Sequence, residues 1–595
     1  MTRRIQQYRT AASLLACFLS LMLPLSASDE KPAADNGETK TTAAVTSATS
    51  SDIEQLKQML IEQQKQINEL RQELAAQKKS EDKTAPAAAQ ANAPAAPTNP
   101  PTAQAAAPEV HKSLGEVAST TGALPPAPPA PEPGPVFNPP AAVPPPQVAD
   151  NSGTSPLQFK IGDAYITPVG FMDMTVVSRS TNPGSGIGTN FGSIPYGNTQ
   201  TGALSETRLS IQNSRIGARV DALVKGWRIM GYWESDFLGQ LGNPPNGGLA
   251  VTSNPFVFRM RLYWVDLTKG KFEFLAGQSW SMATPNRSGI SPLPSDIFYS
   301  QDMDVNYQLG LTWSRVGSYR FILHPTNKVA FGVAFENSEP YIGGGNGGSA
   351  AVLPSAFSGE GGTEINNGTS VISAPALMPD IIAKLAFDPS NRLHFEVVGI
   401  GVADKIANPT GVAGLTPFAT NTKFGGGVEA NLNAGITKNV RFILNTFYSD
   451  GAGRYVFGQA PDFIVRADGS ISLVHSASTT TGFEATFRNT LFYTYYGGVY
   501  IGKDMAFDSN GKTLIGYGPI SSDGQNRAIQ EFSIGTNTTL MRDSRWGALN
   551  LITQYSYVQR NPWLAAAGAP ADAFTNMGYI DLRYTLPGSA PVLGH

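Results

Sequence analysis

The feature that most constrains this chain is a two-residue alternation of apolar and polar side chains, which recurs from Leu157 to Leu586. Because successive side chains of an extended strand point to opposite faces, this period predicts β-strands with one apolar and one polar face. The segment 257–266 shows the pattern clearly. Its interleaved sets are Phe258, Met260, Leu262 and Trp264 on the apolar face, and Arg259, Arg261 and Tyr263 on the polar face.

Similar stretches lie at 216–224, 227–237, 328–336, 381–387, 393–397, 442–448, 483–491, 532–540, 549–557 and 580–586. A soluble β-sandwich would also alternate, so the length of the pattern has to decide. Strands of about ten residues, joined by turns rich in Gly, Asn and Pro, continue for longer than a sandwich requires. Charged side chains on one face and large apolar ones on the other fit a water-filled barrel in lipid. We therefore predict an all-β fold, a transmembrane antiparallel barrel of about 16 strands over 157–595.

Residues 1–28 are typical of an export signal, because a positively charged start precedes an apolar stretch and small residues. The apolar stretch runs from Ala11 to Leu25. A lipoprotein signal is the alternative, since Leu14, Leu15 and Ala16 precede Cys17, but the apolar run continues past that cysteine. Beyond the signal there is no run of about eighteen apolar residues, so a membrane would have to be crossed by strands.

Residues 52–79 form a heptad segment, which predicts a coiled-coil helix. A solvated single helix is the alternative, because Gln63 and Gln77 occupy two of the seam positions. The seam itself does not fix the number of helices. The apolar positions that we expect to face the partner helix are Ile53, Leu56, Leu60, Ile67, Leu70 and Leu74.

Residues 80–156 are rich in Pro and Ala, with clusters such as Pro144-Pro145-Pro146. Proline removes backbone donors and favours extended conformations, so this region is predicted to be a disordered linker without a core. A proline-rich ligand for a partner domain is the alternative. In an exported protein, the linker would hold the coiled coil in the periplasm.

The polar face of the predicted barrel supplies the candidate pore-lining residues. Arginines that face acids across a pore create a transverse field that attracts and orients small anions. The planar guanidinium also matches a carboxylate with two parallel hydrogen bonds. The alternative for each residue is an Arg–acid pair that only stabilises the wall. The candidates are Arg208, Arg215, Arg219, Arg228, Arg259, Arg261, Asp173, Asp221, Glu234 and Asp236.

Other classes of function find little support in the sequence. The five histidines are scattered, and no two have the spacing of metal ligands, so we expect no metal site, no cofactor and no enzymatic activity. The glycine-rich stretch 184–188 follows Asn182-Pro183 and is predicted to be a loop. A net charge of −3 gives no reason to expect binding to nucleic acid.

Several segments resemble known trimeric porins. Segments 214–221 and 231–237 are similar to the early strand pair of Gram-negative general porins, and 276–281 and 450–455 resemble the DcaP-like porins. That resemblance implies a homotrimeric barrel of about 16 strands that passes small anions, including dicarboxylates. The chain departs from the family in its long linker and in the tail 587–595, which lacks the usual terminal aromatic residue.

We therefore expect a bacterial outer-membrane channel for passive diffusion of small polar solutes, favouring small anions such as dicarboxylates. Its expected partners are outer-membrane lipid, two further copies of the chain and the transported solute. The alternative is a structural barrel that tethers the outer membrane to the cell wall through the coiled coil.

Overall fold

The computed structural model describes residues 155–239, 256–297, 301–368, 374–520 and 524–588. Strands dominate this part of the chain. The predicted signal peptide and coiled coil lie outside the described residues, as does the linker apart from Ser155 and Pro156. These assignments therefore stay predictions.

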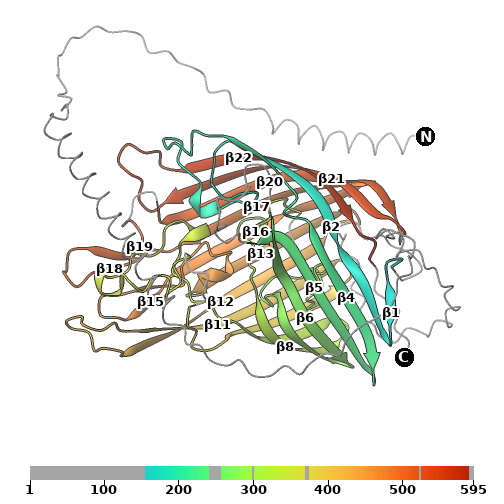
Figure 1. Cartoon of the computed structure of the whole chain (residues 1–595), viewed down its shortest axis with the longest axis horizontal. Coiled ribbons are helices and arrows are strands. Elements are labelled where there is room, and N and C mark those ends of the chain that lie inside the picture. Colours follow the sequence, from blue (N-terminus) through green and yellow to red (C-terminus); the bar gives the residue numbers. More distant parts are fainter. Residues whose placement is uncertain (1–154, 240–255, 298–300, 369–373, 521–523, 589–595) are drawn as a thin grey trace, which may run out of the picture. The chain divides into compact units, whose positions relative to one another are not determined.

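The described residues form one closed antiparallel barrel of 16 strands (Figure 1). The predicted fold class is confirmed. In chain order the wall strands are β2 (Ala164–Arg179), β4 (Arg215–Val224), β5 (Trp227–Gly239), β6 (Val257–Lys269), β7 (Phe272–Trp280), β8 (Arg315–Thr326), β9 (Val329–Glu336), β10 (Asp380–Ser390), β11 (Leu393–Ala407), β12 (Thr420–Gly435), β13 (Val440–Asp450), β16 (His475–Phe487), β17 (Thr490–Ile501), β20 (Asn526–Asp543), β21 (Gly547–Pro562) and β22 (Ala573–Thr585).

Shorter elements complete the described structure. β3 and β4 both pair with β2: β3 pairs with its C-terminal part and β4 with its N-terminal part. β1 pairs with the first residues of β2. Two small hairpins and four 3₁₀ turns lie in the loops. Their bounds are β1 (Phe159–Ile161), β3 (Glu206–Ser210), β14 (Phe463–Val465), β15 (Ile471–Leu473), β18 (Asp504–Phe507), β19 (Leu514–Tyr517), η1 (Phe191–Ser193), η3 (Gly345–Gly347), η4 (Ser355–Phe357) and η5 (Gly453–Tyr455).

The barrel closes where its first and last wall strands pair. β2 pairs with β22 on one side, with Asp173 opposite Arg583, and with β3 and β4 on the other. Every wall strand thus has a partner on both sides, so the described barrel has no open sheet edge. This is the condition that a sheet must meet to stand in hydrocarbon.

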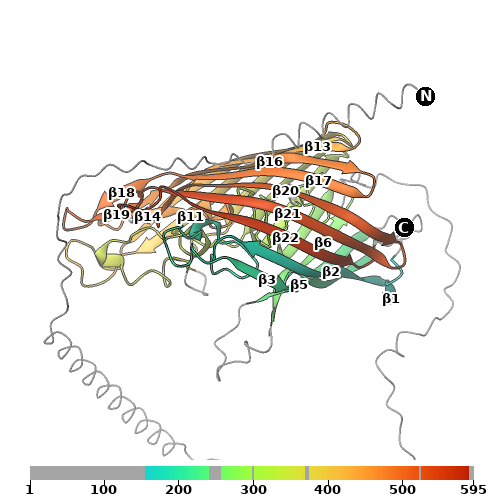
Figure 2. The ribbon, with the colours of Figure 1, turned by 90° about the horizontal axis from the view of Figure 1, so that it is seen from above.

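The two ends of the barrel differ in the length of their connections. Short turns such as Lys225-Gly226 and Asn391-Arg392 join the strands at one end. At the other end the strands are joined by long loops, which carry the hairpins β14–β15 and β18–β19. Figures 1 and 2 show β18 and β19 at the end of the barrel opposite β1. Bacterial barrels have short periplasmic turns and longer extracellular loops. We therefore expect the short-turn end to face the periplasm and the long-loop end to face the outside of the cell.

Most strands follow the predicted division between an apolar outer face and a polar inner face. On β22 the exposed Ile580 and Leu582 flank the fully buried Asp581. On β4 Ile216 is exposed, whereas Asp221 is buried on the inner face. This is the reverse of a soluble protein, in which the charged side chains would point to solvent.

The predicted facing of β6 is wrong over half of its length. Phe258 and Met260 point outward as expected, but Leu262 and Trp264 are buried, with exposed fractions of 0% and 4%. Tyr263, assigned to the polar inner face, is instead 65% exposed.

A β-bulge explains the reversal. Leu262 lies opposite Glu234 and Met260 lies opposite Ser235, which leaves Arg261 as an extra residue in β6. An extra residue inverts the facing of everything that follows it in the strand. Trp264 therefore turns inward, where its ring stacks on Tyr232 of β5 at 5.4 Å between centroids.

Candidate pore constriction

The described residues of the loop 281–314 between β7 and β8, namely 281–297 and 301–314, lie inside the barrel. Its backbone N–H groups donate to carboxylates of three separate wall strands: Met282 to Glu336 at 2.7 Å, Asn286 to Glu396 at 3.1 Å, and Leu309 to Glu531 at 2.8 Å. Further backbone N–H groups of the loop donate to wall amides, from Met303 to Gln554 and from Thr312 to Asn445. The loop therefore crosses the interior and narrows it.

Ion pairs hold the same loop to the wall. Arg287 donates two hydrogen bonds of 2.8 Å to Glu484 of β16, in the bidentate geometry that guanidinium and carboxylate favour. Lys384 of β10 donates to the backbone oxygen of Thr284 at 3.0 Å and to Glu396 at 2.9 Å. Charge-assisted hydrogen bonds are stronger than neutral ones, so these contacts fix the position of the loop.

Two adjacent acids of the loop are buried beside the wall. Asp302 accepts a hydrogen bond from Gln554 at 2.9 Å, and Asp304 accepts one from Tyr579 at 2.9 Å. Burial, together with the nearby Asp304 carboxylate, raises the pKa of Asp302 to about 6. This part of the loop therefore changes charge within the physiological range of pH.

Five of the predicted pore-lining residues form one network on β4, β5 and β6. Arg261 donates to Glu234 at 3.0 Å and to Asp236 at 2.6 Å. Arg259 also donates to Asp236, at 2.7 and 3.0 Å, and Arg215 lies 3.4 Å from Glu234. Arg261 in addition donates to the hydroxyl of Tyr307 in the inward loop at 2.8 Å. The network thus connects the wall to the constriction.

The network carries more positive than negative charge. Three arginines share two carboxylates, and Arg315 at the start of β8 adds a fourth guanidinium over the ring of Trp280 at 5.1 Å. Within the described residues, neither Nε nor Nη1 of Arg315 has a hydrogen-bond partner. We refer to Arg215, Arg259, Arg261 and Arg315, together with Glu234 and Asp236, as the arginine cluster.

The other predicted pore-lining residues lie elsewhere. Arg219 and Asp221 pair with each other through two 2.8 Å hydrogen bonds on β4, and Asp173 pairs with Arg583 at 3.0 Å. Arg208 is exposed on β3 and bound to Glu206, and Arg228 is exposed at the short-turn end. The ion partners of Arg208, Arg219 and Asp173 are thus Glu206, Asp221 and Arg583, which do not belong to the arginine cluster.

Sequence reasoning missed several charged residues that anchor the loop. Lys384, Glu396 and Glu484 stand at inward positions of alternating strands, so the signal that found Arg259 would also have found them. Arg287 gave no such signal, because a loop has no periodicity.

A small pocket lies beside Arg287. The other residues that line it include Asp388, Arg392, His394, Asn433 and Arg441.

A second loop, 451–474, joins β13 to β16 at the long-loop end of the barrel. Arg454 donates to Asp380 at 2.7 Å and to Asp462 at 2.6 Å, and it lies 3.8 Å from Asp404. Both carboxylate oxygens of Asp404 are buried and lack a hydrogen-bond partner among the residues that the structure describes. Arg454 belongs to segment 450–455, in which the sequence resembled the DcaP-like porins.

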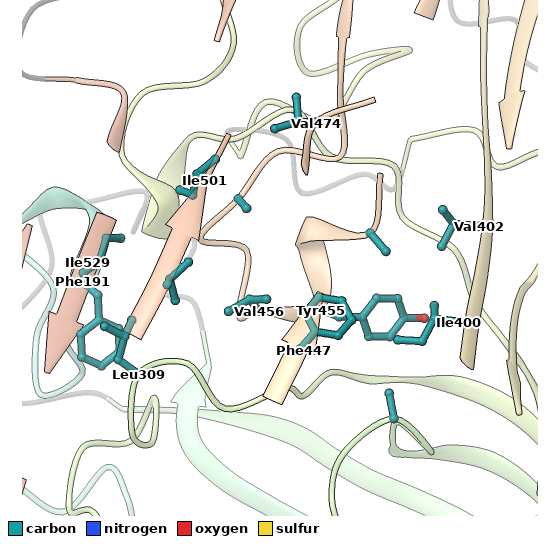
Figure 3. Close-up of a cluster of buried hydrophobic side chains, with 14 of the residues drawn as sticks. Phe191, Leu309, Ile400, Val402, Phe447, Tyr455, Val456, Val474, Ile501 and Ile529 are labelled. Carbon is teal, nitrogen blue, oxygen red and sulfur yellow. The ribbon is translucent and has the colours of Figure 1, made fainter. Parts of the chain in front are cut away.

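Apolar side chains pack beneath this loop. Figure 3 shows Tyr455 and Val456 of the loop beside Phe447 of β13, with Ile400 and Val402 of β11 nearby. The cluster is continuous with buried side chains of the loops 180–205 and 337–379. Described side chains of the loops and of the wall strands thus share one buried apolar cluster.

Comparison with solved structures agrees with this architecture. The outer membrane channel DcaP of Acinetobacter baumannii matches with a TM-score of 0.50 at 13% identity, over 72% of this chain and 99% of that chain. The chain has the porin fold. The resemblance seen in the sequence is thereby confirmed at the level of the fold.

Other solved structures match less well. An anion-selective porin from Comamonas acidovorans has a TM-score of 0.38 at 11% identity, over 71% of this chain and 99% of that chain. OmpT, an outer membrane protein of Vibrio cholerae, has a TM-score of 0.37 at 9% identity, over 72% and 99%. No family model and no curated protein matches the sequence.

The described residues hold neither a cluster of metal-ligating side chains nor a helical span. No group of three or more His, Cys, Asp or Glu side chains is arranged to hold a metal ion there. In the same part of the chain, no helix has both the length and the apolar character needed to cross a membrane.

Proposed function

We propose that this protein is an outer-membrane porin, a channel for passive diffusion of small polar solutes that favours small anions. The observation that carries the proposal is a closed barrel, polar inside and apolar outside, whose lumen is narrowed by the anchored loop 281–314. An apolar outer face suits lipid, and a polar, narrowed interior suits selective passage of hydrated solutes. Porin-like folds support the same class of function.

The arginine cluster supports the anion preference. It places four guanidinium groups against two carboxylates on the wall beside the constriction, so this part of the wall carries excess positive charge. Opposite charge raises the local concentration of an ion and lowers the barrier to its entry. The planar guanidinium favours carboxylates in particular, which supports dicarboxylates as solutes.

Recording in planar bilayers tests this function. The purified protein should form channels in symmetrical KCl, and in a KCl gradient the reversal potential should lie toward that of chloride. A small dicarboxylate such as succinate should reduce the chloride current by competing in the constriction. Absence of any ion current would contradict the channel, whereas a reversal potential toward potassium would contradict only the anion preference.

The assembly follows from the porin resemblance, and we propose a homotrimer to which the heptads 52–79 contribute. Mass measurement in detergent at micromolar concentration should give three chains. A monomer there would contradict the trimer. Deletion of 52–79 should lower the temperature at which the trimer dissociates, and an unchanged temperature would remove only the contribution of the coil.

A further inference from the structure

The short-turn end of the barrel has a regular arrangement of charge that the channel function does not use. Seven turns join wall strands at this end, and each carries an exposed lysine or arginine; none of these described turns contains Asp or Glu, and the exposed Asp543 flanks the turn of Arg545. The described parts of the loops at the opposite end carry more acids than cations. The exposed cations of the turns, with the adjoining Lys269, are Lys225, Lys269, Lys271, Lys328, Arg392, Lys438, Arg488 and Arg545.

Large apolar side chains stand beside these cations on the outer face. Trp227, Phe272, Phe487 and Trp546 are all exposed, by 39–67%, and each lies in or next to a turn. Aromatic side chains of this kind gather where hydrocarbon meets headgroups. The turns therefore stand at the boundary between the apolar band and the aqueous phase.

Three of the cations lie directly over aromatic rings. Lys269 lies 5.2 Å from the ring of Trp227, Arg488 lies 5.4 Å from Phe487, and Arg545 lies 5.5 Å from Trp546. Each pair combines an apolar ring at the level of the hydrocarbon boundary with a positive charge just beyond it. This combination matches a phospholipid, whose acyl chain and phosphate occupy those two levels.

We propose that these turns form a basic collar that binds the headgroups of anionic phospholipids in the periplasmic leaflet. The proposal rests on the outer-membrane location proposed above, but it does not depend on ion conduction. Each turn cation near the surface attracts an anionic headgroup, and the ring beside it orders the chain of the same lipid. Because the cations follow the turns at one end of the barrel, those that face lipid fix the depth at which the barrel sits.

Native mass spectrometry of the whole protein in detergent tests the collar. The probes are dioleoyl phosphatidylglycerol and dioleoyl phosphatidylcholine, which share acyl chains and differ in net charge. The test variant combines K269Q, R488Q and R545Q. Its matched control combines K503Q, K512Q and R527Q, which removes the same charge from exposed residues at the loop end, including Lys503 over Trp563 at 5.8 Å.

We expect the test variant to retain phosphatidylglycerol about tenfold less than the natural protein, with phosphatidylcholine unchanged and the control close to the natural protein. Equal losses in the test and control variants would overturn the proposal. So would equal losses of both lipids, which would indicate apolar contact alone. Displacement of phosphatidylglycerol by an equal concentration of glycerol 3-phosphate would also overturn it, because a free phosphate would then be the ligand.

Two further measurements keep the test decisive. Heat-dependent mobility on a denaturing gel establishes that each variant is folded. If the triple variant fails to fold, the three single variants are compared with the three single controls, and equal retention in all six overturns the collar. Conductance is recorded on the same samples, so a folded barrel that loses lipid but still conducts separates this proposal from the channel function.

Discussion

At the scale of the residue, the charged side chains inside this barrel have two roles. Buried ones stabilise the wall, and exposed ones can act on the solute. Arg261 is only 2% exposed and shares Glu234 and Asp236 with neighbouring arginines, whereas 36% of the Arg259 side chain is exposed. A buried charge that loses its ion partner has neither water nor a counter-ion to stabilise it, so the folded protein loses much of its stability. An exposed one is screened by water. Arg261 is therefore mainly structural, whereas the exposed Arg259 is the arginine of the cluster that can meet a solute.

Removing charge from the arginine cluster should change ion preference. We expect R259A to move the reversal potential toward that of potassium, because an exposed guanidinium disappears while Asp236 keeps its ion pair with Arg261. The matched control, R208A, removes an exposed arginine outside the cluster and should leave it unchanged. The reversal potential in a KCl gradient measures both. An unchanged value in R259A would mean that Arg259 only neutralises Asp236.

At the scale of the element, the decisive one is the loop 281–314, because carboxylates from several strands accept its backbone hydrogen bonds. E484Q removes the charge that pairs with Arg287, and it should loosen that part of the loop. We expect greater noise in the open-channel current, with the barrel folded. E273Q is the control, because Glu273 pairs with His324 at 2.8 Å in the wall. Equal noise in both variants would contradict an anchoring role for Glu484.

The same loop should respond to pH through Asp302. Its folded-state pKa of about 6 lies above the ordinary value of 3.8, so the folded protein binds the proton more tightly than the unfolded one. The contribution of Asp302 to stability is therefore complete below about pH 3.8, declines as pH rises and is lost once pH passes about 6. Thermal unfolding between pH 4 and 7 should show a smaller loss of stability with rising pH in D302N than in the natural protein. Identical pH profiles would contradict this assignment.

The sequence alone predicted those strands well in which one face is uniformly apolar and the other uniformly polar. Alternation located strands such as β4 and β22 and gave their inner faces, because burial of one face fixes the register. It failed within β6, since the single extra residue Arg261 leaves no mark in the pattern. It also gave no account of Arg287 or Arg454, whose positions depend on partners far away in the sequence.

At the scale of the whole molecule, the barrel depends on one seam between the two ends of the described chain. β2 and β22 meet there, and Ser155 donates from its hydroxyl to the backbone oxygen of Pro587 at 2.6 Å. Every other pair of neighbouring wall strands is joined by a turn or a loop of the chain itself. Closing this seam brings together residues about 400 positions apart. Its formation therefore costs more chain entropy than the pairing of any other two neighbouring wall strands.

Asp173 and Arg583 pair across that seam, and their separation in sequence makes them its most sensitive test. Asp173 is buried and accepts hydrogen bonds from Arg583 at 3.0 Å and from Asn213 at 2.9 Å, while Asp581 lies 3.3 Å from the same arginine. R583M would leave two carboxylates without their common cation. We expect it to lower the free energy of unfolding by about 3–5 kcal/mol, measured by urea titration of the folded barrel.

The double variant D173N/R583M should recover part of that loss, because one of the two stranded charges is then neutral. R208M is the matched control, since it removes an arginine that is exposed and paired with Glu206 at 2.7 Å. Its effect should stay within about 1 kcal/mol, as expected of a surface ion pair. If R583M and R208M destabilise the barrel equally, charge pairing does not hold the seam, and backbone hydrogen bonds between β2 and β22 must close the barrel unaided.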